Sequence, residues 1–596
     1  TTRSTKHSKA VDPRQHPILW LNSRQKWVSV DERPASPMRR LPRRRFLKTL
    51  LAGSVALPYA CTERPSPRPI GDVPASFIDR VTPAQGHVLR RPVDPAQFAT
   101  APETTVDALV IGGGVSGLAA CWKLRQAGVE RVLLVELADQ LGGDATAGQA
   151  QGLVFPLGAH YINVPPAEAD CVHEVLSDLN IITGYDTAGR PVIHPDHLLR
   201  WPAERLWEND SWSEGLDPFG AASAAELEQL HAFEDDMLRW TLYRGQDSRR
   251  AFAMPLAYST SDAKVRALDT MTMAEYTSQQ GWSSGRLSWL IDQACKDDYG
   301  GLGTEISAWA GIHYFACRYY DRRVQEQYPS DTLTWPGGNQ FLVDGLAHNL
   351  TQNERWLSTG VVALHPGATT TQALCVDTNT GEPLRVQAKS VVYAGKLHTA
   401  PHVVADMPQP QRHAIEQLDY VPWLVAAVRL SSQLGDAGLA WDNVLMDSPS
   451  VGYVSARHQT SPAARPEGEV LVYYLPLIDD LTDSRKQLLE DDPQPWARRV
   501  LADLTRVHPQ LPDLVEGIDI CRWGHGMVRP TPGVIWGPQA QLRRQPCGRV
   551  ALASCDTGGL PLFEEALFAG IAAAEHCLDT LDMTYTTSLH GMPIHG

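Results

Sequence analysis

The sequence predicts an α/β fold that begins with a strand, a glycine-rich turn, a helix and a second strand. The apolar run 108–111 is typical of a buried parallel strand. Residues 112–117 read GGGVSG, a GxGxxG pattern, and the helix that follows is expected to end at Gly128. A second apolar run, 131–135, ends at Glu136, 24 residues after the first glycine. This order of strand, turn, helix, strand and acid predicts a Rossmann-like unit.

The residue types in this turn suit a bound dinucleotide. Gly112 permits a tight bend, Gly114 lets a pyrophosphate approach the backbone, and Gly117 lets the helix pack closely on the strand. The helix starts at Val115-Ser116, and its free N–H groups and positive dipole end favour phosphate. Glu136 can accept hydrogen bonds from the adenosine ribose hydroxyls.

Further glycine-rich and apolar motifs follow in a recognisable order. A second glycine pair is Gly142-Gly143, and the later segments are GAHY (158–161), TWPGGN (334–339), GVV (360–362), VVYAG (391–395), RVALASCD (549–556) and FEEAL (563–567). From about residue 106 to 581, this series resembles the superfamily of FAD-dependent amine oxidases and phytoene desaturases. The motifs are strong at both ends of the chain and weak in its middle.

The resemblance implies that FAD is the cofactor and that both ends of the chain bind it. Gly142 and Gly143 would wrap the cofactor. The isoalloxazine ring would lie along Ala159, His160 and Tyr161. Other expected contacts are Val362 at the adenine, Asp556 at the ribityl-phosphate region, and a helix start at Glu565 and Ala566 that donates backbone N–H groups beneath the flavin pyrimidine.

Two interleaved domains follow from the same resemblance. A Rossmann-like FAD-binding domain would take residues 104–165, 331–398 and 541–585. An amine-oxidase-like α+β substrate domain would take 166–330 and 399–540, with the site at the interface. The Pro-rich stretch 62–103 is expected to be an extended linker.

Three departures from the family pattern bear on chemistry. The basic residues that usually flank the second glycine pair are replaced by Gln140 and Asp144, and Cys555 replaces a glycine before the acid. Many amine-oxidising members place a lysine near flavin N5 on a strand that resembles 420–430. That strand has no lysine here, which argues against the usual water-bridged arrangement.

Candidate catalytic residues are Tyr161 and His525. Tyr161 would lie beside the flavin, although a core aromatic is an equally good interpretation. His525 lies in a stretch that resembles the family segment beside flavin and substrate. It is expected to be a polar wall residue or a titrating base, and a histidyl–flavin link is the less favoured alternative. Asp297 and Asp298 either hold a substrate ammonium or form a solvated turn.

The amino-terminal segment 1–61 is predicted to contain an export signal. Residues 43–48 read RRRFLK, an apolar run follows over 49–60, and Cys61 comes next. This resembles a twin-arginine (Tat) signal, which implies the Tat export machinery as a partner and a periplasmic or exported protein. Met38 would give a signal of normal length, with residues 1–37 as an upstream extension. Cys61 is either a lipid anchor or close to a simple cleavage site.

Composition excludes several other classes. The net charge of the 596 residues is −15; segment 1–61 holds 13 basic and 3 acidic residues, which leaves 40 basic and 65 acidic residues in the remainder. Such an acidic body argues against nucleic-acid binding. No run approaches the ~20 apolar residues of a membrane helix. The ten cysteines form no CxxC and no zinc-like pattern with histidine, so no metal is predicted.

These observations predict an exported FAD-dependent oxidoreductase that acts on a small molecule. We expect it to remove a hydride from a C–N bond of an amine or polyamine. A phytoene desaturase-like C–C desaturase or isomerase, with a lipophilic substrate, is the first alternative. A flavin-binding protein without turnover is the second.

Overall fold

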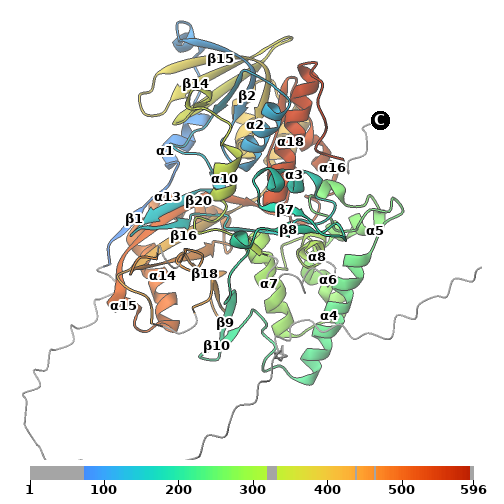
Figure 1. Ribbon diagram of the computed structural model, residues 1–596, viewed down its shortest axis with the longest axis vertical. Coiled ribbons are helices and arrows are strands. Elements are labelled where there is room, and N and C mark those ends of the chain that lie inside the picture. Colours follow the sequence, from blue (N-terminus) through green and yellow to red (C-terminus); the bar gives the residue numbers. More distant parts are fainter. Residues whose placement is uncertain (1–72, 319–331, 436–438, 462–464, 591–596) are drawn as a thin grey trace, which may run out of the picture. The chain divides into compact units, whose positions relative to one another are not determined.

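A computed structural model describes residues 73–318, 332–435, 439–461 and 465–590. Its first large sheet has seven strands in the order β12-β3-β2-β15-β14-β13, with β21 paired to β15 (Figure 1). The pairs among β12, β3, β2, β15 and β21 are parallel, whereas β13 and β14 pair antiparallel. The strands are β2 (Glu103–Ile111), β3 (Val132–Val135), β12 (Arg355–Trp356), β13 (Thr359–Pro366), β14 (Thr371–Asp377), β15 (Pro383–Tyr393) and β21 (Val550–Leu552).

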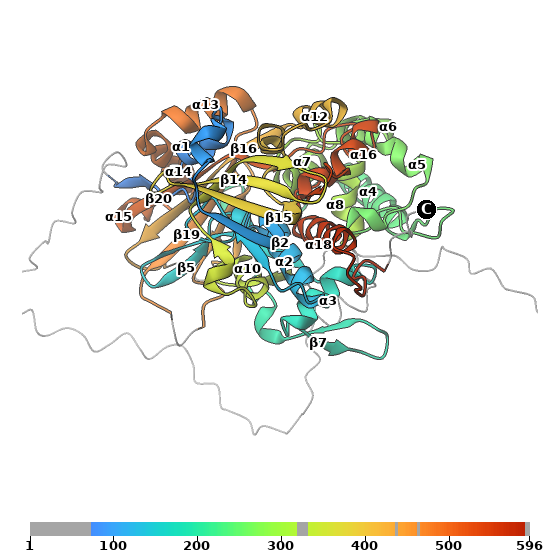
Figure 2. The same cartoon turned by 90° about the horizontal axis from the view of Figure 1, so that it is seen from above.

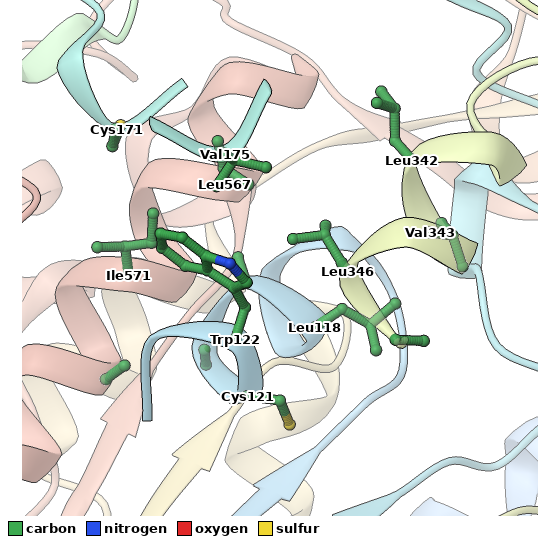
Figure 3. Close-up of a cluster of buried hydrophobic side chains, with 14 of the residues drawn as sticks. Leu118, Cys121, Trp122, Cys171, Val175, Leu342, Val343, Leu346, Leu567 and Ile571 are labelled. Atoms are coloured by element: carbon green, nitrogen blue, oxygen red, sulfur yellow. The ribbon is translucent and has the colours of Figure 1, made fainter. Parts of the chain in front are cut away.

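Helices α2 (Val115–Gln126) and α18 (Phe563–Thr580) pack directly against each other beside this sheet (Figures 1 and 2). Gly570 of α18 permits the close approach, because a Cβ there would lie 2.0 Å from the Ser116 carbonyl oxygen. Figure 3 shows Trp122 of α2 close to Ile571 of α18. The same core includes α3 (Asp170–Asp178) and α10 (Gln340–Leu346). Two helices from distant parts of the sequence therefore meet through apolar packing.

The second large sheet has eight strands in the order β1-β20-β16-β19-β18-β17-β9-β10. They are β1 (Ala75–Phe77), β9 (Glu204–Glu208), β10 (Ser211–Glu214), β16 (Tyr420–Leu430), β17 (Asp442–Leu445), β18 (Gly452–Ser455), β19 (Glu469–Pro476) and β20 (Val515–Val528). Three short hairpin-like pairs complete the strands: β6 (Tyr161–Asn163) with β11 (Thr332–Thr334), β4 (Ala147–Ala150) with β5 (Leu153–Pro156), and β7 (Ile182–Tyr185) with β8 (Pro191–Ile193).

Both faces of the central strands of the second sheet are buried. Leu424 and Val428 of β16 face a core that includes Trp496 and Leu501. Those two residues belong to helix α14 (Pro493–Val507), which neighbours α13 (Leu481–Glu490) and α15 (Leu511–Leu514). The alternate β16 residues, including Trp423, face the opposite side, because successive strand residues point in opposite directions.

A cluster of helices packs around the buried Trp309. Its members have recognisable caps; α4, for example, begins with a capping box between Ser223 and Glu226. These helices are α4 (Ala224–Leu242), α5 (Ala263–Arg266), α6 (Met273–Gln279), α7 (Gly285–Tyr299) and α8 (Ala308–Cys317). The remaining short helices are α1 (Pro83–Gly86), α11 (Ala400–Val403), α12 (Gln409–Glu416), α16 (Pro538–Arg544) and α17 (Cys555–Gly558).

The segment 73–103 differs from the extended linker that its prolines predict. Strand β1 pairs in parallel with β20, and Phe98 is buried against Val362 and Leu374. Prolines disfavour long helices and central strands, but they do not prevent a chain from burying apolar side chains. The described part of the predicted linker is thus folded onto both sheets.

The predicted signal sequence, Met38 and Cys61 lie outside the described residues. Within the described ranges, no helix is long and apolar enough to cross a membrane. The nine cysteines of those ranges are free thiols. All but Cys555 are buried, Cys121 and Cys577 among them.

Candidate active site

Two connected cavities lie between the sheets. The larger has a volume of about 750 Å³ and the smaller about 180 Å³. They share wall residues, among them Asp144, Ala159, Asn339 and Lys396. A single ligand can therefore extend from one cavity into the other.

The larger cavity is built on the GxGxxG turn. Gly112, Gly114, Val115 and Ser116 line it, together with Glu136. The Glu136 carboxylate is buried and accepts the Gly113 N–H at 2.5 Å and the Ala138 N–H at 2.7 Å. Burial raises the pKa of Glu136 above its usual range, while these backbone donors act in the opposite direction.

The three motif glycines are required for different reasons. Gly112 has φ +103°, and a Cβ at Gly117 would lie 1.8 Å from the Gly112 carbonyl oxygen, so the fold itself needs both. Gly114 has φ −78°, and its nearest neighbour to a Cβ would be 3.8 Å away. The protein alone could accept alanine at Gly114. Because Gly114 has no side chain, it leaves space in the cavity.

The second glycine pair closes over the first turn. Gly142 and Gly143 line the larger cavity, and Gly142 N–H donates to the Gly113 carbonyl at 2.9 Å. Asp144, where a basic residue was expected, pairs with Lys396, whose Nζ also donates to the Gly526 carbonyl at 2.7 Å. Burial raises the pKa of Asp144, opposed by Lys396. The positive charge beside the second glycine pair is therefore supplied by Lys396, in the segment after β15.

The predicted ring-side segment lies at the junction of the cavities. Ala159 lines both cavities, whereas His160 and Tyr161 line the smaller one. Asn339 holds this segment, because its Nδ2 donates to the Tyr161 carbonyl at 3.0 Å. His160 stacks on Tyr474 at 4.6 Å between ring centroids, and burial lowers its pKa to about 4. At neutral pH, His160 is therefore uncharged.

The structure shows how three of the predicted contact residues lie. The Val362 side chain points away from the larger cavity, toward Phe98, and the neighbouring Val361 lines the cavity. The contact predicted at Val362 concerned the backbone of this strand, and it stays a prediction. Ala566 lines the cavity, but its N–H donates to the Leu562 carbonyl within α18 and is not free. The Glu565 carboxylate turns away and accepts the Leu256 N–H. Free helix N–H groups therefore belong to the first turn of α18, which begins at Phe563 and includes the backbone of the predicted Glu565.

Asp556 is buried on the wall of the smaller cavity. Its Oδ2 accepts the Leu397 N–H at 2.9 Å and the Tyr420 hydroxyl at 3.0 Å. The carboxylate thus joins α17 to β16 and to the segment after β15.

The smaller cavity combines aromatic walls with acidic side chains. Trp423 and Tyr474 are among its walls. The Tyr161 hydroxyl donates to Asp297 Oδ2 at 3.0 Å, and burial together with the adjacent Asp298 raises the pKa of Asp297 to about 6. Asp298 forms an ion pair with Arg318. The solvated-turn alternative for Asp297 and Asp298 is therefore wrong, because both line a cavity at the end of α7.

His525 lies on the larger cavity and not on the smaller. Its ring stacks on His398 at 4.2 Å. Burial, with His398 and nearby cations, lowers the pKa of His525 to about 3. The imidazole is neutral at physiological pH. This environment therefore does not make His525 a base that titrates near neutral pH.

Comparison with known proteins decides the family. A model of flavin-containing amine oxidoreductases matches residues 115–578. The chain belongs to this family. It is an FAD-dependent oxidoreductase, and its amine-oxidase-like two-domain fold is the one predicted.

Several relatives of this flavin-containing oxidoreductase are informative. Oxidoreductase PigB of Serratia sp. is 22% identical over 554 residues, which cover 83% of this chain and 78% of PigB. A lycopene-forming phytoene desaturase of Paracoccus sp. is 32% identical over 133 residues, or 22% of this chain and 25% of the desaturase. The solved structure of a putrescine oxidase double mutant has a TM-score of 0.58 at 15% identity, and covers 81% of this chain and 100% of that chain.

The residues of the two cavities fit FAD. Gly114 leaves room for a ligand, and Asn339, fully buried at the junction, has an Oδ1 without a hydrogen-bond partner. A buried polar atom of this kind calls for a ligand or water donor. The holding residues would be the two glycine turns, Glu136 and the first turn of α18. Bound there, FAD supplies a two-electron oxidant that accepts a hydride.

Sequence reasoning missed several wall residues. Lys396 directly follows the predicted strand 391–395. Trp423 lies within the predicted strand 420–430, which lacks the lysine that many amine-oxidising family members have there. A search for the cation that compensates Asp144 could have suggested Lys396. No motif marked Arg80, because it reaches the larger cavity through long-range packing. Asn339 ends the TWPGGN motif, but no role was predicted for it.

Proposed function

We propose that this oxidoreductase oxidises a C–N bond of a small amine, with Asp297 as the ammonium-binding residue. One observation carries the proposal: Asp297 faces the smaller cavity and has no ion-pair partner among the described residues, whereas its neighbour Asp298 is neutralised by Arg318. A buried carboxylate of this kind gains by binding a cation. Trp423 and Tyr474 add aromatic surfaces that favour an ammonium group.

The chain's own groups can hold and prepare an amine. The Tyr161 hydroxyl fixes the Asp297 carboxylate, and the aromatic walls exclude water. An alkylammonium must lose a proton before its C–N bond can be oxidised. The pKa of Asp297, raised to about 6, brings this carboxylate closer to a proton acceptor's working range. No lysine is needed for these two steps.

Cavity size and charge favour a small amine over a lipophilic chain. The smaller cavity, about 180 Å³, lies below the ~300–1,000 Å³ of typical ligand pockets. A lipophilic substrate would also desolvate Asp297 without pairing it, which is unfavourable. The relation to a phytoene desaturase keeps C–C desaturation as the second candidate. Its test is the same substrate panel.

Anaerobic titration of the holoprotein tests the proposal. We expect the flavin absorbance to bleach with an amine from a panel of putrescine, spermidine and simple monoamines, and to return in air or with an added acceptor. Asp297→Asn should raise the concentration for half-bleaching about 10- to 100-fold, the equivalent of a lost charge-assisted hydrogen bond. The matched control is Asp292→Asn on the same helix, outside both cavities.

Three outcomes would contradict the proposal. Bleaching by an apolar alkene and by no amine would assign C–C chemistry. A flavin that no donor reduces, while sodium dithionite still reduces it, would support a flavin-binding protein without turnover. Equal effects of the two aspartate variants would remove Asp297 from the site.

We further propose that the enzyme is exported by the Tat route. The RRxFLK motif at 43–48 and the apolar run after it support this. Cell fractionation after Arg43→Lys with Arg44→Lys should move the protein from the periplasm or cell surface to the cytoplasm. Labelling with radioactive palmitate, with Cys61→Ser as the control, distinguishes lipidation from simple cleavage. An unchanged location of the double-lysine variant would oppose Tat export.

A further inference from the structure

The segment 79–90, here called the strap, forms part of the wall of the larger cavity. Asp79, Arg80, Thr82, His87 and Arg90 are among its lining residues. The strap precedes residues 115–578, which the family model matches. Figure 2 shows helix α1 of the strap beside α13, one of the helices that cover the second sheet.

Both ends of the strap are anchored, one on each sheet. Before the strap, β1 pairs with β20, and Asp79 accepts three hydrogen bonds from Arg522 at 2.6–2.9 Å. Toward its other end, the side chains of Val88 and Leu89 lie near Gly360 of β13. The strap thus spans from the second sheet to the first along the cavity.

Arg80 occupies the place where the sequence lacks a basic residue. Its Nη2 donates to the Ala147 carbonyl at 2.6 Å, and Gln140 Nε2 donates to the same oxygen at 3.3 Å. Gln140 replaces the basic residue that usually precedes the second glycine pair. An arginine from the strap therefore reaches the position that an arginine or lysine of the motif would otherwise occupy.

The charge of Arg80 is not compensated by the protein. Arg522 is paired with Asp79, and Lys396 with Asp144. Arg80 has no carboxylate at ion-pair distance among the described residues, and its buried Nε lacks a hydrogen-bond partner. A half-buried guanidinium of this kind is stabilised by an anion, and its planar donors match phosphate oxygens.

The surroundings identify the anion. Ala147 follows Thr146, which lies against Gly142, and Gly142 pairs with Gly114 of the first turn. The GxGxxG turn and the start of α2 are where a dinucleotide places its phosphates. We propose that the strap is part of the FAD site and that Arg80 binds the anionic diphosphate of the cofactor. This role concerns cofactor retention and is separate from the oxidation reaction.

Release of FAD from the holoprotein tests the proposal without an activity assay. Flavin fluorescence after dilution gives the dissociation constant and the release rate. Arg80→Ala should weaken FAD binding about 10- to 100-fold, as expected for a lost hydrogen bond to a charged group. Arg80→Lys, which keeps the charge, should weaken FAD binding less than Arg80→Ala. The matched control is Arg91→Ala, an exposed arginine next to the strap that does not line the cavity and should leave the dissociation constant unchanged.

A second measurement separates cofactor binding from support of the fold. Thermal unfolding is followed for each variant with FAD removed and with FAD in excess. Arg80→Ala should reduce the rise in Tm that FAD produces and should leave the Tm of the apoprotein nearly unchanged. An equal fall in both Tm values would show that Arg80 only supports Ala147. An FAD dissociation constant within about twofold of wild type would also overturn the proposal.

Discussion

The larger cavity is built around the two glycine turns, whereas the smaller one gathers aromatic and acidic side chains. In the larger cavity, close backbone approaches at Gly112 and Gly117 set the shape. In the smaller, Tyr161, Asp297 and Trp423 come from three distant parts of the chain. The difference teaches that the cofactor site depends on local backbone geometry, while substrate selection depends on tertiary packing.

Gly117→Ala should produce the largest effect, because it disrupts the geometry of the turn itself. A Cβ there would lie 1.8 Å from the Gly112 carbonyl oxygen. We expect the free energy of unfolding of the apoprotein to fall by about 3 kcal/mol or more. Urea unfolding followed by circular dichroism measures it. Wild-type stability would show that the turn tolerates displacement.

Gly114→Ala should separate cofactor binding from folding. The backbone of Gly114 is compatible with alanine and no protein atom is nearer than 3.8 Å. The free energy of unfolding of the apoprotein should be unchanged or should rise by less than about 1 kcal/mol. FAD affinity, measured by fluorescence titration, should fall about 10- to 100-fold through steric crowding. Loss of apoprotein stability comparable to that of Gly117→Ala would abolish the distinction.

The pH dependence of amine oxidation should report the smaller cavity. Since the pKa of Asp297 is raised to about 6, its carboxylate is charged above that pH and becomes neutral below it. We expect kcat/KM for an amine to fall about tenfold for each pH unit below the pKa. Asp297→Asn should remove this acidic limb. An identical limb in the variant would assign it to another group.

His525→Gln should have the smallest effect. The pKa of His525 is lowered to about 3, so its charge does not change between pH 5 and 9. We expect the shape of the pH profile to be preserved and kcat/KM to change less than about threefold, the equivalent of a weak contact. Stopped-flow reduction across that pH range measures it. If the variant lacked a limb near neutral pH that the wild-type pH profile shows, His525 would again be assigned as a titrating base.

Local patterns predicted the parts of the fold that local chemistry determines. Strand β16 spans the predicted 420–430, and α2 begins at Val115, within the GxGxxG pattern, as predicted. The same patterns did not place the side chain of Val362, which points away from the larger cavity. They also missed Arg80, since a proline-rich composition carries no sign of tertiary contacts. Asp297 was predicted as one of two alternatives, and only the packing of α7 decided between them.

The pairing of β1 with β20 also has a consequence for the order of events during synthesis. Ser76 and Asp519, which are hydrogen-bonded between these strands, are 443 residues apart. At about 5–20 residues per second, the ribosome needs roughly 20–90 seconds to make the chain between them. During that interval the strap has no strand to join, and the cavity is complete only after Ala566 of its wall has been made. FAD therefore has a period of access before the amino-terminal segment settles over it.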